Sequence, residues 1–390
     1  MITRDYVLKG PKLREIYLST CFPIEMSVSQ GGRSMGHCSD FVQYIYHAGM
    51  RISPEFDDET WIQKMQNCPH TTFFHGAYPI EVFFAVPNIR NIWLPNIEQI
   101  ERFQSWLLPR THTVLCKVRV ICQALEKYLD HHNITTRPIL KYVSHSTPDP
   151  VEPISSKNLT RNFNTFFHSY GKSGWKHTPE IITCFRWHKD WPTLTVVGDR
   201  DANSWGYNSG NPVPHNVRLL QRVDINTLRT LQFQNGIHIC PSNNEGYGHY
   251  INEARAIGAV LLTTDHPPMN EFVKDGVNGI LVGHNPPYPE AYRLIEPHFY
   301  PSVNVKPFHI CEGIKKVLEM STDDRIEMGR KARQTYEQET HEMIENLKLV
   351  EKEAIEWLYH GKSGNLNGWI AQRSEVTQSI LDQCLIVENI

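Results

Sequence analysis

The chain has no long hydrophobic run and no dominant charge, and these absences exclude several classes of protein. No stretch approaches the roughly 18 consecutive apolar residues of a transmembrane helix, and the N-terminus has no positive segment followed by an apolar one. The 39 Lys and Arg residues nearly balance 42 Asp and Glu residues, for a net charge of −3. The basic field that non-specific nucleic-acid binding needs is therefore missing. We expect a soluble, cytoplasmic protein with no signal peptide and no nucleic-acid partner.

Cysteine and histidine are present, but not at the spacings that bind metals. The nine Cys residues are spread singly, without a Cys-x-x-Cys motif, and their odd number excludes a complete disulfide framework. This usage predicts a reducing compartment. The 20 His residues include no His-Glu-x-x-His motif and no Cys/His pair at zinc-ligand spacing, so we expect no metal site.

The positive signal is an alternation of strand and helix patterns, which predicts an α/β fold with parallel, doubly wound sheets. The length of 390 residues suits two or three domains of about 150 residues each. Three prolines within 146–153 indicate a linker. We expect domains at 1–150 and 151–355 and a helical tail at 356–390.

The expected strands before the linker are 14–21, 71–75, 90–94, 113–116 and 139–143. Those after it are 164–167, 193–197, 216–220, 236–240, 259–263 and 279–282. Helices are expected at 35–47, between the strand 113–116 and residue 127, at 178–188 and at 248–257. A pair of charged helices is expected over 311–359, and a further helix near 375–385.

The segment from Pro241 to Gly258 carries the richest chemistry. It joins an expected strand to a helix, and the free N–H groups of a helix start beside glycines form an anion site. Glu245 lies in the loop and Glu253 about one turn into the helix. Carboxylates beside a phosphate site suit the hydroxyls of a ribose or a sugar. The alternative is that glutamate only complements the helix dipole.

A second anion signal lies in the loop at 170–178. Lys172 and Lys176 stand four residues apart before an expected helix, and two positive charges there suit a diphosphate leaving group. The spacing of a nucleotide-binding P-loop is absent. An ordinary solvated lysine turn is the alternative.

Four further residues carry weaker signals. Gly31 and Gly32 lie in the first strand-to-helix loop, where glycine permits close backbone approach. His75 ends a strand at the carboxyl edge of the first sheet, where open α/β sheets bind ligands. Arg222 follows the strand expected at 216–220. Structural roles remain open for all four.

An Asp-x-Asp match at Asp199 and Asp201 also follows an expected strand. Two such carboxylates can share a divalent metal. Short acidic turns are frequent, however, and we do not assign a metal there.

Taken together, these segments resemble the retaining, nucleotide-sugar-dependent glycosyltransferases with two facing Rossmann-like domains, the GT-B architecture, in a family 4-like form. The likeness is best over 163–335. It rests on Pro-Ser-x-x-Glu-Gly-aromatic-Gly ending at Gly248, on Glu-Ala-x-Ala-x-Gly starting at Glu253, and on the strand segment 275–282.

The resemblance implies a role for each site residue. Glu245 faces the donor sugar, the amides near Tyr247 to His249 hold the phosphates, and Glu253 binds the ribose. Lys172 and Lys176 serve as the basic pair at the diphosphate, although the family usually has Arg in the first position. His75 completes the catalytic set from the first domain. The donor-binding set is Gly31, Gly32, Arg222, Gly246, Tyr247, Gly248, His249 and Glu253.

The resemblance also implies the chemistry. A sugar moves from a UDP- or GDP-sugar to a carbohydrate or lipid-linked acceptor, with retention at the anomeric carbon and without a metal or other cofactor. The final helix crosses back to the first domain in this fold. Open alternatives are an epimerase or inverting transferase on the same fold, a metal-dependent transferase, and a degenerate transferase that only binds carbohydrate. Peripheral membrane contact also stays open.

Overall fold

The computed structural model describes residues 72–75, 84, 90–96, 102–147, 149–151, 154–155, 158–171, 173–199, 210–283, 303 and 305–358. The chain divides into two compact units. Unit 1 comprises Met1–Pro148, Leu294–Phe299 and Thr340–Ile386, and unit 2 comprises Asp149–Arg293, Tyr300–Glu339 and Val387–Ile390. The elements expected at 14–21, 35–47 and 375–385 lie outside the described residues.

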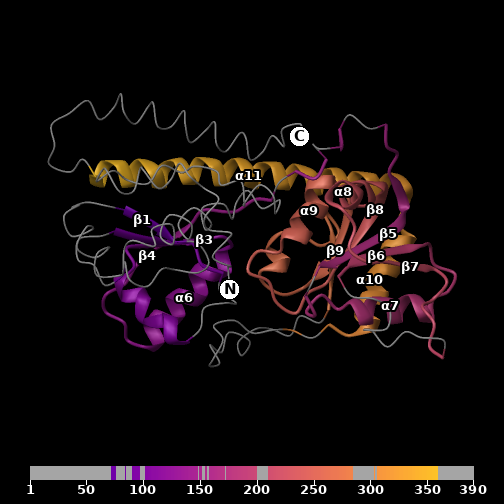
Figure 1. Ribbon diagram of the computed structural model, residues 1–390, viewed down its shortest axis with the longest axis horizontal. Helices are drawn as coiled ribbons and strands as arrows, with labels where there is room; N and C mark the ends of the chain where they lie inside the picture. The colour runs from indigo at the N-terminus through magenta and orange to yellow at the C-terminus, as the bar shows by residue number, and fades with distance from the viewer. Residues whose placement is uncertain are drawn as a thin grey trace, which may run out of the picture. The chain divides into compact units, whose positions relative to one another are not determined.

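Unit 1 contains a parallel four-stranded sheet (Figure 1). Its order is β1 (Thr72–His75), β2 (Arg90–Trp93), β3 (Thr113–Cys116) and β4 (Ile139–Tyr142). Helix α6 (Arg119–His131) connects β3 to β4 and follows a 3-10 helix, η4 (Arg102–Arg110). The apolar positions of α6 recur at helical spacing and are buried, as Ile121, Leu125 and Leu129 show.

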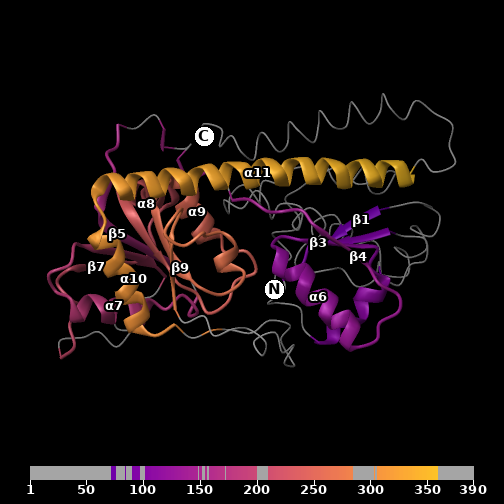
Figure 2. The ribbon, with the colours of Figure 1, turned by 180° about the vertical axis from the view of Figure 1, so that it is seen from behind.

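Unit 2 contains a parallel six-stranded sheet with helices on both faces (Figures 1 and 2). In sheet order the strands are β10 (Ile280–Val282), β9 (Val260–Thr264), β8 (Asn235–Cys240), β5 (Asn162–Gly171), β6 (Leu194–Gly198) and β7 (Val217–Leu220). One face carries α7 (Thr178–Trp187) and α10 (Pro307–Glu319), and the other carries α8 (Ile225–Gln234) and α9 (His249–Ile257). Chain order reverses between β5 and β8, so this is a doubly wound sheet.

The core of unit 2 lies between this sheet and its helices. Every residue of β8 and of β9 is buried, as expected for parallel strands covered on both faces. Phe166, Ile237 and Leu262 from three strands pack in one cluster with Ile314 from α10. The α/β class with parallel sheets is thus confirmed, and the described strands match the predicted ones to within a few residues.

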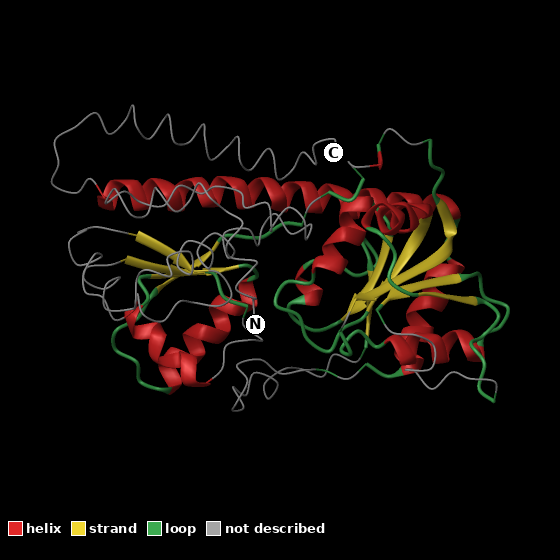
Figure 3. Cartoon of the chain, in the orientation of Figure 1, coloured by secondary structure: helices red, strands yellow, loops and turns green. Residues whose placement is uncertain are grey.

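Helix α11 (Thr322–Leu358) is a single helix of 37 residues, drawn in red with the other helices in Figure 3. Its residues up to Glu339 belong to unit 2, and those from Thr340 belong to unit 1. The change of unit therefore falls at 339–340, whereas the second domain was expected to run to 355. With α10, it forms the two helices predicted over 311–359.

Helix α8, the 3-10 helix η4 and two disulfides were not predicted from the sequence. Helix α8 begins after Asp224, whose side chain accepts a hydrogen bond from the Thr227 amide at 3.0 Å. Two disulfides join Cys116 to Cys122 and Cys184 to Cys311, while Cys240 is free and buried. Neither pair has a motif spacing, and Cys184 and Cys311 lie 127 residues apart, so only the fold brings them together. In the described part of the chain, no helix is long and apolar enough to cross a membrane.

Candidate functional site

The candidate site lies at the carboxyl ends of β5 and β8, where the strand order of unit 2 reverses. Doubly wound sheets bind ligands at this switch point, because the loops after the two strands leave in opposite directions and open a crevice. One loop, 172–177, joins β5 to α7, and the other, 241–248, joins β8 to α9. The two segments that carried the strongest sequence signals therefore meet.

The 241–248 loop is held by hydrogen bonds to the neighbouring loop and strand. The Ser242 amide donates to Thr264 Oγ1 at 2.9 Å, and that hydroxyl donates to the Ser242 carbonyl at 2.9 Å. The Asn243 amide donates to the Trp175 carbonyl at 2.9 Å, which ties the two site loops together. Gly248 ends the loop at φ 87°, and a Cβ there would lie 3.0 Å from Ile251 Cδ1. Only glycine fits this turn without strain.

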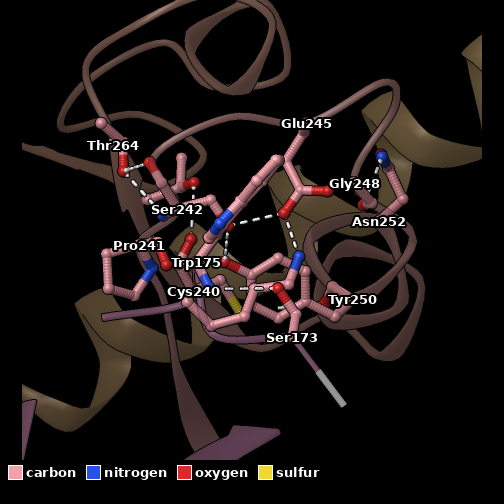
Figure 4. Close-up of polar contacts among 12 residues, drawn as sticks. Ser173, Trp175, Cys240, Pro241, Ser242, Glu245, Gly248, Tyr250, Asn252 and Thr264 are labelled. Atoms are coloured by element: carbon pink, nitrogen blue, oxygen red, sulfur yellow. Dashed lines mark hydrogen bonds and ion pairs between the residues drawn. The ribbon is translucent and has the colours of Figure 1, made fainter. Parts of the chain in front are cut away.

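Lys176 and Glu245 form an ion pair between these loops (Figure 4). Their side chains are only 14 % and 12 % exposed, so the charges are largely removed from water. Ser242 Oγ donates to the same carboxylate oxygen, Glu245 Oε1, at 2.5 Å. Lys176 Nζ also lies 3.8 Å from the ring centroid of Tyr250. The Lys176 cation and the Glu245 carboxylate are thus in contact where little water reaches them.

Glu253 lies in the second turn of α9 and is held by α8. Its Oε1 pairs with Arg229 Nη1 at 2.9 Å, and its Oε2 accepts from Gln232 Nε2 at 2.8 Å. Arg229 Nη1 also donates to Gln232 Oε1 at 3.0 Å. All three residues are buried, so Glu253 sits in a closed polar triad with a fixed carboxylate orientation.

His168, on β5 beneath the site, is a neutral structural residue. Burial lowers its pKa to about 4. Its Nδ1 lies 2.7 Å from the Ile239 carbonyl, which can only accept, so Nδ1 carries the proton. Its Nε2 then accepts from Thr178 Oγ1 at 2.9 Å, which links β8 to the start of α7.

The remaining predicted residues are distributed as follows. Gly246, Tyr247, Gly248 and His249 lie in the loop with Glu245 and at the start of α9. Arg222 is exposed after the edge strand β7 and has no hydrogen bond or ion pair to another described residue. Its donor-binding role stays a prediction.

Four further sequence-predicted residues have little or no described geometry. His75 ends β1 and pairs in register with Trp93, but its side chain is not described. Lys172, Gly31 and Gly32 lie outside the described residues.

Only the first residue of the Asp-x-Asp motif lies within the described residues. Asp199 follows β6, and Asp201 lies outside the described residues. Across the described ranges, no three His, Cys, Asp or Glu side chains gather as a metal site.

Sequence reasoning assigned no role to four residues that contact the two glutamates directly or through one other residue. Ser242 and Tyr250 lie within the motif around Glu245, but hydroxyl geometry cannot be read from spacing. Arg229 and Gln232 lie on α8, which was not predicted. The Asp224 cap was a usable signal for that helix.

Comparisons with known proteins agree with this fold. Residues 189–292 match the family described as "Glycosyl transferases group 1". A search of curated protein sequences finds no match. The crystal structure of the GtfA/B complex is similar at a TM-score of 0.58 and 15 % identity, covering 81 % of this chain and 60 % of that one.

Two other solved structures are similar at the same level. The pneumococcal O-GlcNAc transferase GtfA, in complex with UDP and GlcNAc, aligns at a TM-score of 0.55 and 14 % identity over 78 % of this chain and 61 % of that chain. Trehalose-6-phosphate synthase, studied for glycosyl transfer with retention, aligns at a TM-score of 0.54 and 11 % identity. The alignment covers 79 % of this chain and 82 % of that chain. This chain spans about three fifths of the GtfA chains. Such identities show the fold alone, which is of GT-B type, and the family match covers residues 189–292.

Proposed function

We propose that this chain transfers a sugar from a nucleoside-diphosphate sugar to a carbohydrate or other acceptor, with retention and without a metal or other cofactor. The observation that carries the proposal is the ion pair of Lys176 with Glu245 at the switch point of unit 2, with Glu253 held by Arg229 in the second turn of α9. A cation for a leaving diphosphate and two oriented carboxylates for sugar hydroxyls are what such a reaction needs.

The proposed roles follow from charge and position. Lys176 stabilises the negative charge that grows on the diphosphate as the bond from its oxygen to the anomeric carbon breaks. Backbone amides between Gly246 and His249, at the start of α9, bind the phosphates. Glu245 accepts hydrogen bonds from hydroxyls of the donor sugar, and Glu253 accepts them from the ribose.

The transfer needs no enzyme nucleophile. The acceptor hydroxyl attacks the anomeric carbon from the face that the diphosphate leaves, and its proton passes to a diphosphate oxygen. One carbon–oxygen bond forms as one breaks on the same face, so the configuration is retained. The likeness to trehalose-6-phosphate synthase and the bound UDP of GtfA support retention and a UDP-sugar donor.

The test measures release of nucleoside diphosphate from a panel of UDP-, GDP- and ADP-sugars, with and without a chelator. We expect release from one donor, unchanged by the chelator. Both Lys176→Ala and Glu245→Gln should lower kcat by about 100-fold, the usual cost of losing a transition-state partner. Lys189→Ala, which removes an exposed lysine of the same unit, is the matched control and should change kcat less than about twofold.

Three results would point elsewhere. Release that needs a divalent cation would favour the metal-dependent alternative. An anomeric proton signal of the inverted product would exclude retention. If the protein neither binds UDP or GDP nor turns over any donor of the panel, a degenerate scaffold would be favoured.

A further inference from the structure

We propose that Tyr250, acting with Ser242, is the positioning residue that holds Lys176 and Glu245 in their paired geometry. The placement of the pair is argued from the structure alone, and its kinetic consequence rests on the proposed function. Tyr250 is the second residue of α9, so its side chain comes from a rigid element, whereas Glu245 lies in the loop before that helix.

The phenol hydroxyl begins a directed chain of hydrogen bonds. Tyr250 Oη lies 2.6 Å from Ser242 Oγ and 2.9 Å from the Pro241 carbonyl oxygen. Ser242 gives its only hydrogen to Glu245, so its oxygen accepts from Tyr250, whose single hydroxyl hydrogen is shared between Ser242 Oγ and the Pro241 carbonyl oxygen. Burial holds the pKa of the Tyr250 phenol well above its usual range, and the phenol therefore stays a donor. The chain thus ends on the Glu245 carboxylate.

The ring of Tyr250 contacts Lys176, the other member of the ion pair. Lys176 Nζ lies 3.8 Å from the ring centroid, within the range of a cation–π contact. The ammonium is therefore fixed from two directions, by the Glu245 carboxylate and by the face of the ring. One residue thus contacts the cation directly and the carboxylate through Ser242.

This arrangement leaves a specific atom available. Both contacts of the Glu245 side chain, from Lys176 and from Ser242, are to Oε1. Oε2 has no hydrogen bond to any other described residue, and it carries no dashed line in Figure 4. The positioning chain therefore turns Oε1 inward and leaves Oε2 to accept a hydroxyl of the donor sugar.

The role can be separated from simple packing by three variants. Tyr250→Phe keeps the ring and removes the hydroxyl, Tyr250→Leu removes both, and Ser242→Ala breaks the chain in the middle. The matched control is Tyr336→Phe, which removes the hydroxyl of a buried tyrosine in α11. Its ring also has a cation–π contact, because Arg333 Cζ lies 5.5 Å from the ring centroid.

The first measurement is the rate of reductive methylation of each lysine in the full chain, followed by peptide mass spectrometry. It requires no substrate, so it tests the placement even if the proposed function is wrong. We expect Lys176 to react several-fold faster in Tyr250→Phe and Ser242→Ala, and faster still in Tyr250→Leu. The other lysines, and every lysine of Tyr336→Phe, should react as in the wild type.

The second measurement is the KM and kcat of UDP-glucose and UDP-N-acetylglucosamine turnover. Loss of a hydrogen bond of this chain, to the carboxylate in Ser242→Ala and to the Ser242 hydroxyl in Tyr250→Phe, should lower kcat by up to about tenfold, with KM changed less than about threefold. Because both act through one chain, the double variant should be no slower than the slower single variant.

Either of two outcomes would overturn the proposal: wild-type methylation of Lys176 in both Tyr250→Phe and Ser242→Ala, or an equal change in Tyr336→Phe. If Tyr250→Leu does not fold, the two conservative variants decide. A wild type that neither binds UDP nor turns over a donor would refute the proposed function, while the methylation result would still stand.

Discussion

At the scale of single residues, each glutamate of the motif is already held by a cation. Glu245 is paired with Lys176, and Glu253 is paired with Arg229. Carboxylates removed from water need such partners, because an unpaired buried charge is unstable. The contacts of Glu245 are all to Oε1, whereas both oxygens of Glu253 are engaged, by Arg229 and Gln232. Under the proposed function, this orientation exists before the donor binds, which favours catalysis.

The Arg229–Glu253 pair should therefore matter for stability. Replacing Arg229 with Met keeps the volume but leaves Glu253 buried without its cation. We expect the free energy of unfolding to fall by about 3 kcal/mol, as for other broken buried pairs. Urea denaturation followed by circular dichroism measures this change.

The matched control is Arg330→Met on α11. Arg330 forms a similar pair with Glu327 at 2.7 Å, but the two side chains are 53 % and 45 % exposed. Exposed pairs contribute little, so this variant should lose less than about 0.5 kcal/mol. Equal losses in the two variants would contradict the argument from burial.

Two buried histidines should make unit 2 sensitive to acid. Burial lowers the pKa of both His168 and His238 to about 4, from an ordinary value of 6.5. Between these values the unfolded chain binds protons that the folded chain does not, so stability rises with pH. Their contribution is complete above pH 6.5 and is lost as the pH falls toward 4, with a combined slope of up to about 2.7 kcal/mol per pH unit.

Unfolding free energies measured from pH 4.5 to 7.5 test this slope. His238→Gln removes one titrating group, and its side chain amide can still donate to the Gln232 carbonyl that His238 Nε2 contacts at 2.9 Å. The slope should then be about half that of the wild type. A variant with the full wild-type slope would show that His238 titrates normally.

At the scale of elements, helices α9 and α11 approach each other through two glycines. Gly258 ends α9 at φ 75°, and Gly329 lies in α11. A Cβ added to Gly329 would lie 2.2 Å from the Gly258 carbonyl oxygen, which is backbone and cannot rotate away. The contact holds α9, and with it Glu253, close to α11.

This contact predicts a result opposite to helix propensity. Alanine favours a helix over glycine by about 1 kcal/mol, so propensity alone predicts that Gly329→Ala stabilises α11. The clash should instead lower the free energy of unfolding by about 2 kcal/mol. Gln334→Ala, on an exposed position of the same helix, is the control and should be neutral or slightly stabilising. A Gly329→Ala variant as stable as the wild type would mean that the helices are not in close contact.

The elements that the sequence predicted best are those whose pattern is local. Buried parallel strands such as β8 and β9 are short apolar runs, and α7 and α9 begin after clear loop signals. Helix α8 was missed because only two of its residues, Arg229 and Gln232, are buried, and both are polar. No apolar periodicity marks such a helix.

The same distinction applies to the site. Glu245, Glu253 and Lys176 could be singled out as candidates because the motif and the loop positions are visible in the sequence. The contacts that orient them could not, because Tyr250 reaches Glu245 only through Ser242, and Arg229 reaches Glu253 from another helix. These contacts depend on how α8 and α9 pack, which the sequence does not state.

At the scale of the whole molecule, α11 is a covalent link between the two units. In unit 2, Arg325 donates to the Phe163 carbonyl at 2.9 Å, and Glu339 pairs with the buried Arg255 at 2.8 Å. In unit 1, Thr340 lies 2.8 Å from Ser146, and Glu353 pairs with Lys141 at 2.7 Å. Each half of the helix is thus anchored within its own unit.

A break in α11 near residues 339–340, where the helix passes from unit 2 to unit 1, should therefore let the two units unfold independently. Gln338→Pro, at an exposed position, removes one helical hydrogen bond and clashes with the preceding turn, at a cost of about 3 kcal/mol. Because the anchors on each side remain, we expect both units to stay folded but to unfold in two resolved calorimetric transitions. Gln338→Ala keeps the helix and should unfold as the wild type does. A single transition shifted as a whole in Gln338→Pro would instead show that the units are held together by more than the continuity of α11.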